Sequence, residues 1–198
     1  MQDQNSGDRI GPEGYNFHSE YSVTIEHPIE TVFSVLGDGK NMDRVVRLSN
    51  LCERFELQKN DEVVLDAKCN GQLSHAVLGR EYPAVPPETS SKLLSRQYFL
   101  LCETVPILPG WTKTIEILGV QTWDSETKMA LYESRTDLGV SVWKLRKFEG
   151  MEGNDGKIRT KVTEVIRGKC PVLLKLIVQK TTNTSHRAHM DSYHTLFV

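Results

Sequence analysis

The segment Pro171–Ser192, PVLLKLIVQKTTNTSHRAHMDS, decides the fold, because it contains no glycine and no proline after its first residue. Proline suits the first turn of a helix, and the apolar residues that follow it recur at helical spacing. The sequence therefore predicts a C-terminal helix of about 24 residues, roughly 36 Å long at about 1.5 Å per residue. The first half of this helix is apolar on nearly every side, so we expect a sheet to enclose it.

A strand and two short helices are predicted near the other end of the chain. Tyr15–Glu26 is rich in aromatic and β-branched residues that alternate with polar ones, as in a half-buried strand. His27-Pro28 ends this strand, because the residue before a proline avoids helical backbone. Apolar residues then recur at helical spacing over 29–36 and again over 42–48, with Gly37-Asp38-Gly39 between them.

The middle of the chain consists of strand patterns separated by turn signals. The Asn-Asp pair within Gln58–Asp61 predicts a hairpin that joins antiparallel strands over 51–57 and 62–68. Three prolines predict a long loop over 83–91. Short antiparallel strands at this spacing indicate a strongly curved sheet or partial barrel. The remaining strands are expected over 92–106, 112–123, 128–136, 140–148 and 157–167.

The order of these elements and several short sequences resemble one known superfamily. The residues that carry the resemblance are HPIETVF at 27–33, LYES at 131–134, WKLR at 143–146, TKVTE at 160–164 and AHMDSY at 188–193. In these features the chain resembles the START-like helix-grip (SRPBCC) superfamily, which includes ligand carriers, lipid-transfer domains and polyketide cyclases. The resemblance implies an α+β fold in which a curved antiparallel sheet of about seven to eight strands wraps around the long C-terminal helix, with two short helices after the first strand. It also implies a hydrophobic cavity between the sheet and that helix.

Length and charge narrow the range of functions. The chain has 198 residues, with 24 Lys and Arg against 26 Asp and Glu, for a net charge of -2. This balance lacks the broad cationic surface that nonspecific nucleic-acid binding needs, so we expect no nucleic-acid partner. Residues 1–14 are glycine-rich and show no periodicity, which predicts a flexible tail before one helix-grip domain over 15–198.

No segment has the pattern of a signal peptide or a transmembrane helix. The longest apolar run, 171–178, is interrupted by Lys175 and is shorter than the roughly 20 residues that cross a bilayer. We therefore expect a cytoplasmic protein that contacts membranes at most transiently, and a monomer or weak dimer. The cysteines are scattered without a C-x-x-C pair, which argues against a zinc ribbon or a disulfide framework.

The leading hypothesis is that the protein encloses a hydrophobic small molecule, such as a lipid, sterol or aromatic metabolite, as a carrier or sensor. Burial of the apolar surface of the ligand supplies affinity, and one or two polar side chains fix its orientation. The candidate ligand-binding residues, taken from the strands and from the predicted helix, are Tyr98, Leu100, Ile115, Ile117, Leu174, Ile177, Val178 and Thr181.

The alternation within the strand over 92–106 leaves open which face points inward. Arg96, Tyr98 and Leu100 lie on one face, whereas Phe99 and Leu101 lie on the other. With the first face inward, Arg96 and Tyr98 could orient a carboxylate or a carbonyl in an apolar cavity. The alternative is that Arg96 lies at the rim while Tyr98 packs in the core.

A second hypothesis is a cyclase, dehydratase or isomerase that uses the same cavity, with Glu164, Tyr98 and Arg135 as candidate catalytic residues. Glu164 lies between two apolar residues of its strand face, where burial would raise its pKa toward the range of a general base; alternatively, it points to solvent. Arg135 shares a strand face with Glu133, and the two could form a buried charge pair. A third hypothesis is a protein-interaction module with a filled core.

The histidines of the C-terminal segment do not predict a metal site. His186 and His189 are three residues apart and share a helix face, a spacing compatible with two metal ligands. Two ligands are too few, and neither a cysteine nor a carboxylate partner is evident, so we expect His186, His189 and His194 on a solvated face. No phosphate-binding loop or nucleophile elbow is present, and no motif predicts a cofactor.

Overall fold

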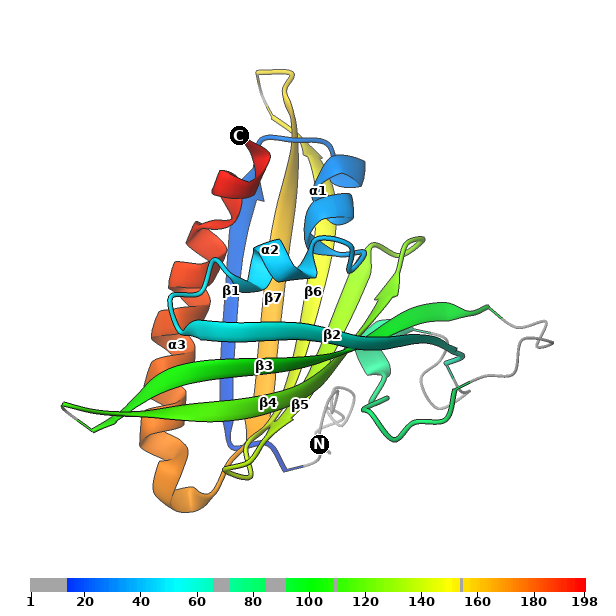
Figure 1. Cartoon of the computed structure of the whole chain (residues 1–198). Helices are drawn as coiled ribbons and strands as arrows, with labels where there is room; N and C mark the ends of the chain where they lie inside the picture. Colours follow the sequence, from blue (N-terminus) through cyan, green and yellow to red (C-terminus); the bar gives the residue numbers. More distant parts are fainter. Residues whose placement is uncertain (1–13, 66–71, 85–91, 109, 154) are drawn as a thin grey trace, which may run out of the picture.

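Seven antiparallel strands form one curved sheet in the order β1-β7-β6-β5-β4-β3-β2 in the computed structural model, which describes residues 14–65, 72–84, 92–108, 110–153 and 155–198 (Figure 1). The predicted α+β helix-grip architecture is therefore confirmed, with seven strands in the part of the chain described. The strands are β1 Phe17–Ile25, β2 Cys52–Val63, β3 Leu94–Leu108, β4 Trp111–Asp124, β5 Met129–Thr136, β6 Ser141–Glu152 and β7 Ile158–Lys169.

In the part of the chain that the structure describes, three α-helices lie on the concave side of the sheet. Helices α1, Ile29–Leu36, and α2, Met42–Val46, join β1 to β2, as the sequence predicts. Helix α3, Lys175–Asp191, runs beside β1, and the C-terminus ends near α1 (Figure 1). A 3-10 helix at Val172–Leu174 precedes α3, and another at Tyr193–Phe197 follows it.

The sheet has a core on each face. On the concave face, Phe33 from α1, Phe148 from β6 and Met190 from α3 belong to one buried cluster. On the convex face, the segment 72–84 covers the sheet and packs Leu73 and Leu78 against buried residues of β5 and β6. The Nε1–H of Trp143 donates to the carbonyl oxygen of Ala76 at 2.9 Å, so this covering segment is also tied by a buried hydrogen bond.

The hairpin predicted at Gln58–Asp61 is wrong, because β2 continues through these residues as one strand. The strand changes register with β3 between Leu57 and Asn60, and Asp61 then pairs with Arg96 across the ladder. The Asp61 carboxylate accepts hydrogen bonds from Arg96 at 2.7 and 2.8 Å. The Asn-Asp pair is therefore accommodated at an irregularity in a strand, because a tertiary ion pair holds Asp61 in the ladder.

The expected enclosure of the first half of the C-terminal helix is also wrong. The α-helix begins at Lys175, and the apolar residues Val172, Leu173 and Leu176 are 83%, 94% and 84% exposed. The second half of α3, which is more polar in sequence, contributes the buried residues His186 and Met190. Helix α3 packs mainly against β1, so its first turns project past the sheet instead of lying under it.

Two predictions fall wholly or partly outside the described residues. The flexible tail predicted over 1–14 is one of them, because only Gly14 is described. The loop predicted over 83–91 is the other, since 85–91 lie outside the description. Among the residues that are described, no helix combines the length and the apolar character needed to span a bilayer.

Candidate functional site

A cavity of about 200 Å³ lies between the concave face of the sheet and the helices α1 and α2. It is mostly apolar, because both helices and strands β3, β4, β6 and β7 present aliphatic or aromatic side chains to it. Helix α3 contributes His189 to the lining. The apolar residues that line the cavity are Val35, Leu36, Met42, Val45, Val46, Phe99, Leu101, Ile117, Val142 and Ile166.

An ion pair between β6 and β7 lies at one end of the cavity, where Arg146 is part of the lining. Arg146 and Glu164 are register partners on these strands, and the Nε of Arg146 lies 2.5 Å from Oε1 of Glu164. Both side chains are buried, and Tyr193 bridges them: its hydroxyl accepts from Arg146 at 2.5 Å and donates to Glu164 at 2.6 Å. The buried charges are therefore paired and hydrogen-bonded, as burial of ions requires.

The same network closes the C-terminal end of α1. The guanidinium of Arg146 donates to the carbonyl oxygen of Leu36, and the hydroxyl of Tyr132 donates to the same oxygen at 3.1 Å. The amide of Gln121 donates to the carbonyl oxygen of Gly37 at 2.8 Å. Helix carbonyls that have no partner within the helix are thus satisfied by side chains of the sheet, and Arg146 complements the negative end of the helix dipole.

Electrostatics at this end hold Glu164 as a carboxylate. Burial opposes ionisation, but Arg146, and after it Lys144 and His186, outweigh burial and keep the pKa of Glu164 well below its ordinary value. The expected rise in this pKa is therefore wrong in direction, because sequence cannot reveal the cation opposite. Burial and the nearby Lys144 lower the pKa of His189 to about 4, so its ring is neutral at physiological pH.

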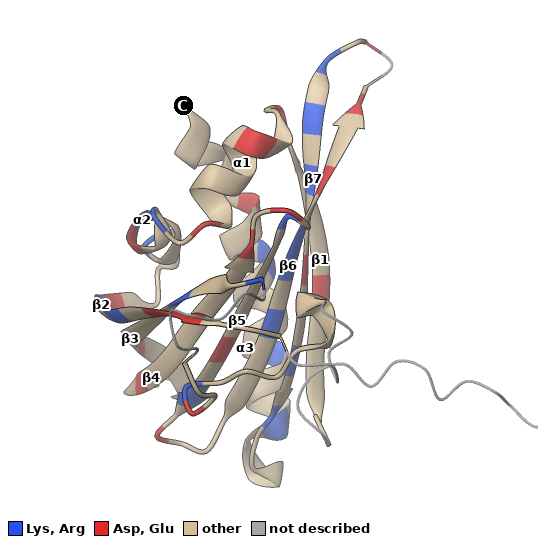
Figure 2. Ribbon diagram, turned by 90° about the vertical axis from the view of Figure 1, so that its right-hand side faces the viewer, with Lys and Arg blue, Asp and Glu red and all other residues tan. Residues whose placement is uncertain are grey.

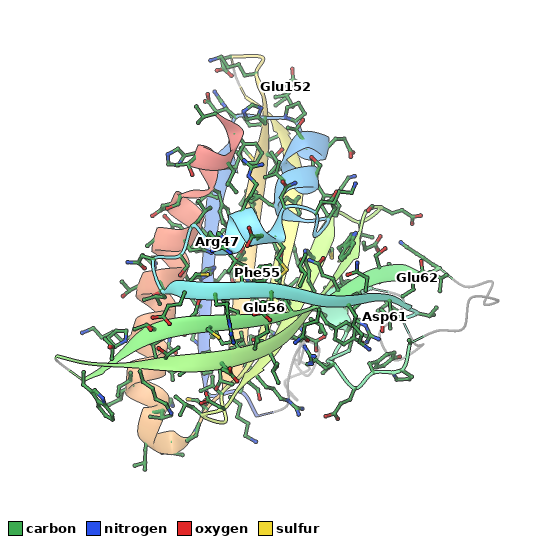
Figure 3. The ribbon with its side chains drawn as sticks, viewed as in Figure 1. Arg47, Phe55, Glu56, Asp61, Glu62 and Glu152 are labelled. Atoms are coloured by element: carbon green, nitrogen blue, oxygen red, sulfur yellow. The ribbon has the colours of Figure 1, made fainter. Side chains whose placement is uncertain are left out.

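Of the strand residues predicted to bind ligand, Ile117 lines the cavity and Ile115 is buried on the same strand face without lining it. Tyr98 and Leu100 lie on the opposite, convex face, because Phe99 and Leu101 are the residues of β3 that line the cavity. The hydroxyl of Tyr98 donates to Asp61 at 2.9 Å. Asp61 lies toward the end of β2 that is remote from α3 (Figure 3).

The four residues predicted on the helix are half-buried and are not among the described residues that line the cavity. Leu174 precedes the α-helix, and Val178 packs against the cluster of Phe17, Ile166 and Cys170. Ile177 and Thr181 lie on the same half of α3. The cavity instead meets the last turns of α3 at His189, because the first turns project past the sheet.

The predicted Glu133–Arg135 pair does not form, since Glu133 is buried on the convex side whereas the side chain of Arg135 is 77% exposed. Glu133 accepts the backbone N–H of Leu78 at 3.0 Å and that of Gly79 at 2.8 Å. Burial raises the pKa of Glu133 to about 7, while these two N–H groups oppose the rise. The predicted catalytic residues Glu164, Tyr98 and Arg135 therefore do not converge on one site.

The three C-terminal histidines turn toward separate partners. Nδ1 of His186 lies 2.9 Å from Oγ of Ser19, and its Nε2 lies 3.2 Å from Oε2 of Glu164. His189 donates to the carbonyl oxygen of Val45 at 2.7 Å, and His194 contacts the carbonyl oxygen of Asp191. The predicted solvated face is wrong for His186, which is buried. Within the described ranges, no three metal-ligating side chains gather in one place.

Sequence reasoning missed Lys144 and Arg146, the two cations that line the cavity. A signal was present, because Lys144 and Arg146 alternate with Trp143 and Leu145 on a strand that is otherwise largely apolar. Figure 2 shows that Lys and Arg recur along β6 and β7. Alternation alone does not reveal that these basic residues are buried, because their burial requires α1 to pack on β6.

Comparison with solved structures identifies proteins of the same architecture. One is TTHA0849 from Thermus thermophilus, at a TM-score of 0.57 and 15% identity over 90% of this chain and 94% of that chain. Another is the Zhui aromatase/cyclase from Streptomyces sp. R1128, at a TM-score of 0.58 and 11% identity over 90% of this chain and 91% of that chain. No protein-family model and no curated protein sequence matches. The chain therefore shares the α+β helix-grip fold of these two structures.

Proposed function

We propose that the protein binds a small, largely apolar molecule in the concave cavity, as a carrier or sensor. The observation that carries this proposal is the composition of the lining, with aliphatic and aromatic side chains over most of the wall and a few polar groups on β4, β5 and β6. Ligand sites in proteins typically have this composition, because apolar burial supplies affinity and a few polar groups fix orientation. In a protein-interaction module with a filled core, side chains would occupy this space.

The volume limits the size of the ligand. About 200 Å³ is below the roughly 300–1,000 Å³ typical of sites for drug-sized molecules. A compact aromatic molecule or a short acyl chain fits this volume better than a whole sterol or a two-chain lipid. This refines the broad class of lipids, sterols and aromatic metabolites that the sequence suggests.

The arrangement of charged groups favours binding over proton transfer. Oε1 of Glu164 already accepts from Arg146 and Tyr193, and its low pKa makes it a poor base. Tyr98 and Arg135 lie away from the cavity. The fold is shared with an aromatase/cyclase, but at 11% identity that likeness concerns architecture alone.

The test is uptake of the neutral fluorescent probe N-phenylnaphthylamine by the full chain. Ile117→Trp places an indole where the half-buried Ile117 lines the cavity, and should abolish uptake. Leu118→Trp is the matched control, because Leu118 is the next residue of β4, faces the other side and is 43% exposed. Binding that survives Ile117→Trp but is lost in Leu118→Trp would move the site to the convex face and overturn the proposal.

Native mass spectrometry of the purified protein supplies an independent readout. A co-purified molecule of low mass that is absent from Ile117→Trp would support the proposal and identify the ligand. Absence of any such molecule, together with no probe uptake by the wild-type protein, would contradict it. Circular dichroism of each variant checks that the fold is retained.

A further inference from the structure

We infer that the molecule bound in the concave cavity carries a carboxylate and that the ammonium group of Lys144 is its counter-ion. The inference rests on the proposed function, because it assigns a chemical class to the ligand of the same cavity. It is carried by the charges that line the cavity and by the hydrogen bonds that each charged group already makes.

The lining is unbalanced in charge. Among the described residues that line the cavity, Lys144 and Arg146 are cations and none is a carboxylate. His189 also lines it, but its ring is neutral and its Nε2–H is donated to Val45. The nearest carboxylate, Glu164, is fully buried behind the lining. The cavity therefore has a cationic end that the protein does not neutralise from within the lining.

Arg146 is already engaged by the protein. Its Nε bonds Glu164 at 2.5 Å, and its Nη2 bonds the hydroxyl of Tyr193 at 2.5 Å. Its Nη1 bonds the hydroxyl of Tyr132 at 3.0 Å and also the carbonyl oxygen of Leu36. Arg146 is thus a positioning residue that orders the wall, and its charge is matched by the charge of Glu164.

Lys144 differs from Arg146 because its ammonium group lacks a close partner. The Nζ of Lys144 lies 3.8 Å from Oε2 of Glu164, which is beyond hydrogen-bonding distance. That same oxygen faces Nε2 of His186 at 3.2 Å. Nζ also lies 4.4 Å from the ring centroid of Tyr132. Within the residues described, no hydrogen-bond acceptor engages this ammonium group, and the side chain remains 21% exposed.

Burial of an ammonium group is costly, and the carboxylate that faces Lys144 lies 3.8 Å away and is shared with Arg146, so an anion in the cavity would gain from Nζ. Burial lowers the pKa of Lys144, an effect that Glu164 opposes and Arg146 reinforces. Glu103 on β3 also favours the charged form of Lys144, but it does not line the cavity. A ligand carboxylate within reach of Nζ would supply the missing charge-assisted hydrogen bond.

The ligand class follows from charge and volume together. Lys144 and Arg146 share the single carboxylate of Glu164, so one positive charge is in excess and matches a monoanionic carboxylate, whereas a phosphate would bring a larger negative charge. The apolar wall and the volume of about 200 Å³ accept a compact aromatic or short acyl body. We therefore assign the ligand to the aromatic and short-chain carboxylic acids.

Isothermal calorimetry with naphthoate and naphthylmethanol tests the inference, because the two molecules share a ring system and differ in charge. The wild-type protein should bind naphthoate about tenfold or more tightly than naphthylmethanol, as expected for a hydrogen bond between charged groups. Lys144→Met should abolish this preference and leave affinity for naphthylmethanol within about threefold. Lys147→Met is the matched control, since Lys147 lies on the opposite face of β6 and is also half-buried.

The outcomes separate the inference from the proposed function. Equal wild-type affinities for both molecules would overturn the inference while leaving the cavity as a ligand site. Failure of both molecules and of N-phenylnaphthylamine to bind would overturn the proposed function itself. Loss of affinity for both molecules in a folded Lys144→Met protein would contradict the counter-ion role, because Lys144 would then be needed for the structure of the cavity and not for the charge of the ligand. Lys144→Arg retains the charge and should keep the preference for naphthoate.

Discussion

Arg146 and Glu164 stand opposite each other on β6 and β7, with Nε and Oε1 2.5 Å apart and both side chains sealed from solvent. This pair anchors three parts of the fold at once, because Arg146 also bonds the end of α1 and both residues bond Tyr193 after α3. Glu164, which the sequence suggests as a candidate base, is therefore one partner of a structural ion pair.

Loss of one partner of this pair should destabilise the protein strongly. Glu164→Gln leaves Arg146 buried without a counter-charge, and we expect the free energy of unfolding to fall by about 3–5 kcal/mol in urea denaturation. Glu149→Gln on the same pair of strands is the control, because Glu149 is 61% exposed and 3.9 Å from Lys161, so its loss should cost at most about 1 kcal/mol. Equal effects of the two substitutions would contradict the structural role of the pair.

Gly119 on β4 lies against the ring of Phe99, which lines the cavity. A methyl group at this position would overlap the ring, so Gly119→Ala should destabilise the protein by about 1–3 kcal/mol. Phe99→Leu introduced into Gly119→Ala should recover part of that loss, because the smaller side chain vacates the overlap. Gly150→Ala, whose added methyl meets nothing closer than 3.9 Å, should have little effect on the melting temperature.

Glu133 should make stability fall as pH rises. Its pKa is raised to about 7 in the folded protein from an ordinary value of 4.5, so the folded state binds more protons than the unfolded state between these values. The unfolding free energy contributed by Glu133 therefore decreases from about pH 4.5 to about pH 7. Glu133→Gln should gain stability relative to wild type between those limits, measured by urea denaturation across the range. A difference between Glu133→Gln and wild type that stays constant across this pH range would refute this assignment.

His189 should make the stability of the protein fall as pH is lowered. Its pKa falls from 6.5 to about 4 on folding, so the unfolded state binds more protons within this interval. Stability should therefore decline as pH is lowered from about 6.5 to about 4. His189→Gln can retain a donor toward Val45 and should flatten this decline in thermal unfolding. If His194→Gln at the exposed C-terminal turn flattened it equally, the effect would not arise from His189.

The exposed apolar residues that precede and begin α3 should be dispensable for stability. Val172, Leu173 and Leu176 are each more than four-fifths exposed, so serine at each position should change the unfolding free energy by no more than about 0.5 kcal/mol. Leu36→Ala, at a buried position of α1, should instead cost about 2–5 kcal/mol. A large loss from the serine variants would mean that this segment is covered in solution.

Local patterning determined much of the fold without tertiary information. The strands over 92–106, 112–123, 128–136, 140–148 and 157–167 were each predicted to within a few residues, because alternation and turn signals depend on neighbouring residues alone. The positions of α1 and α2 after His27-Pro28 follow for the same reason. The local sequence therefore suffices to predict a curved antiparallel sheet followed by a C-terminal helix.

Only the tertiary structure decided which face of each strand became the cavity wall. Alternation shows that Tyr98 and Phe99 lie on opposite faces of β3, but it does not show which face lines the cavity. That choice depends on α1 and α2, which pack over one face, and on the segment 72–84, which covers the other. The charge of Glu164 depended on Arg146, which lies 18 residues away in sequence but directly opposite in register. The direction in which a side chain points, its burial and its pKa depend on contacts between residues that are distant in sequence. The local sequence pattern does not specify those contacts.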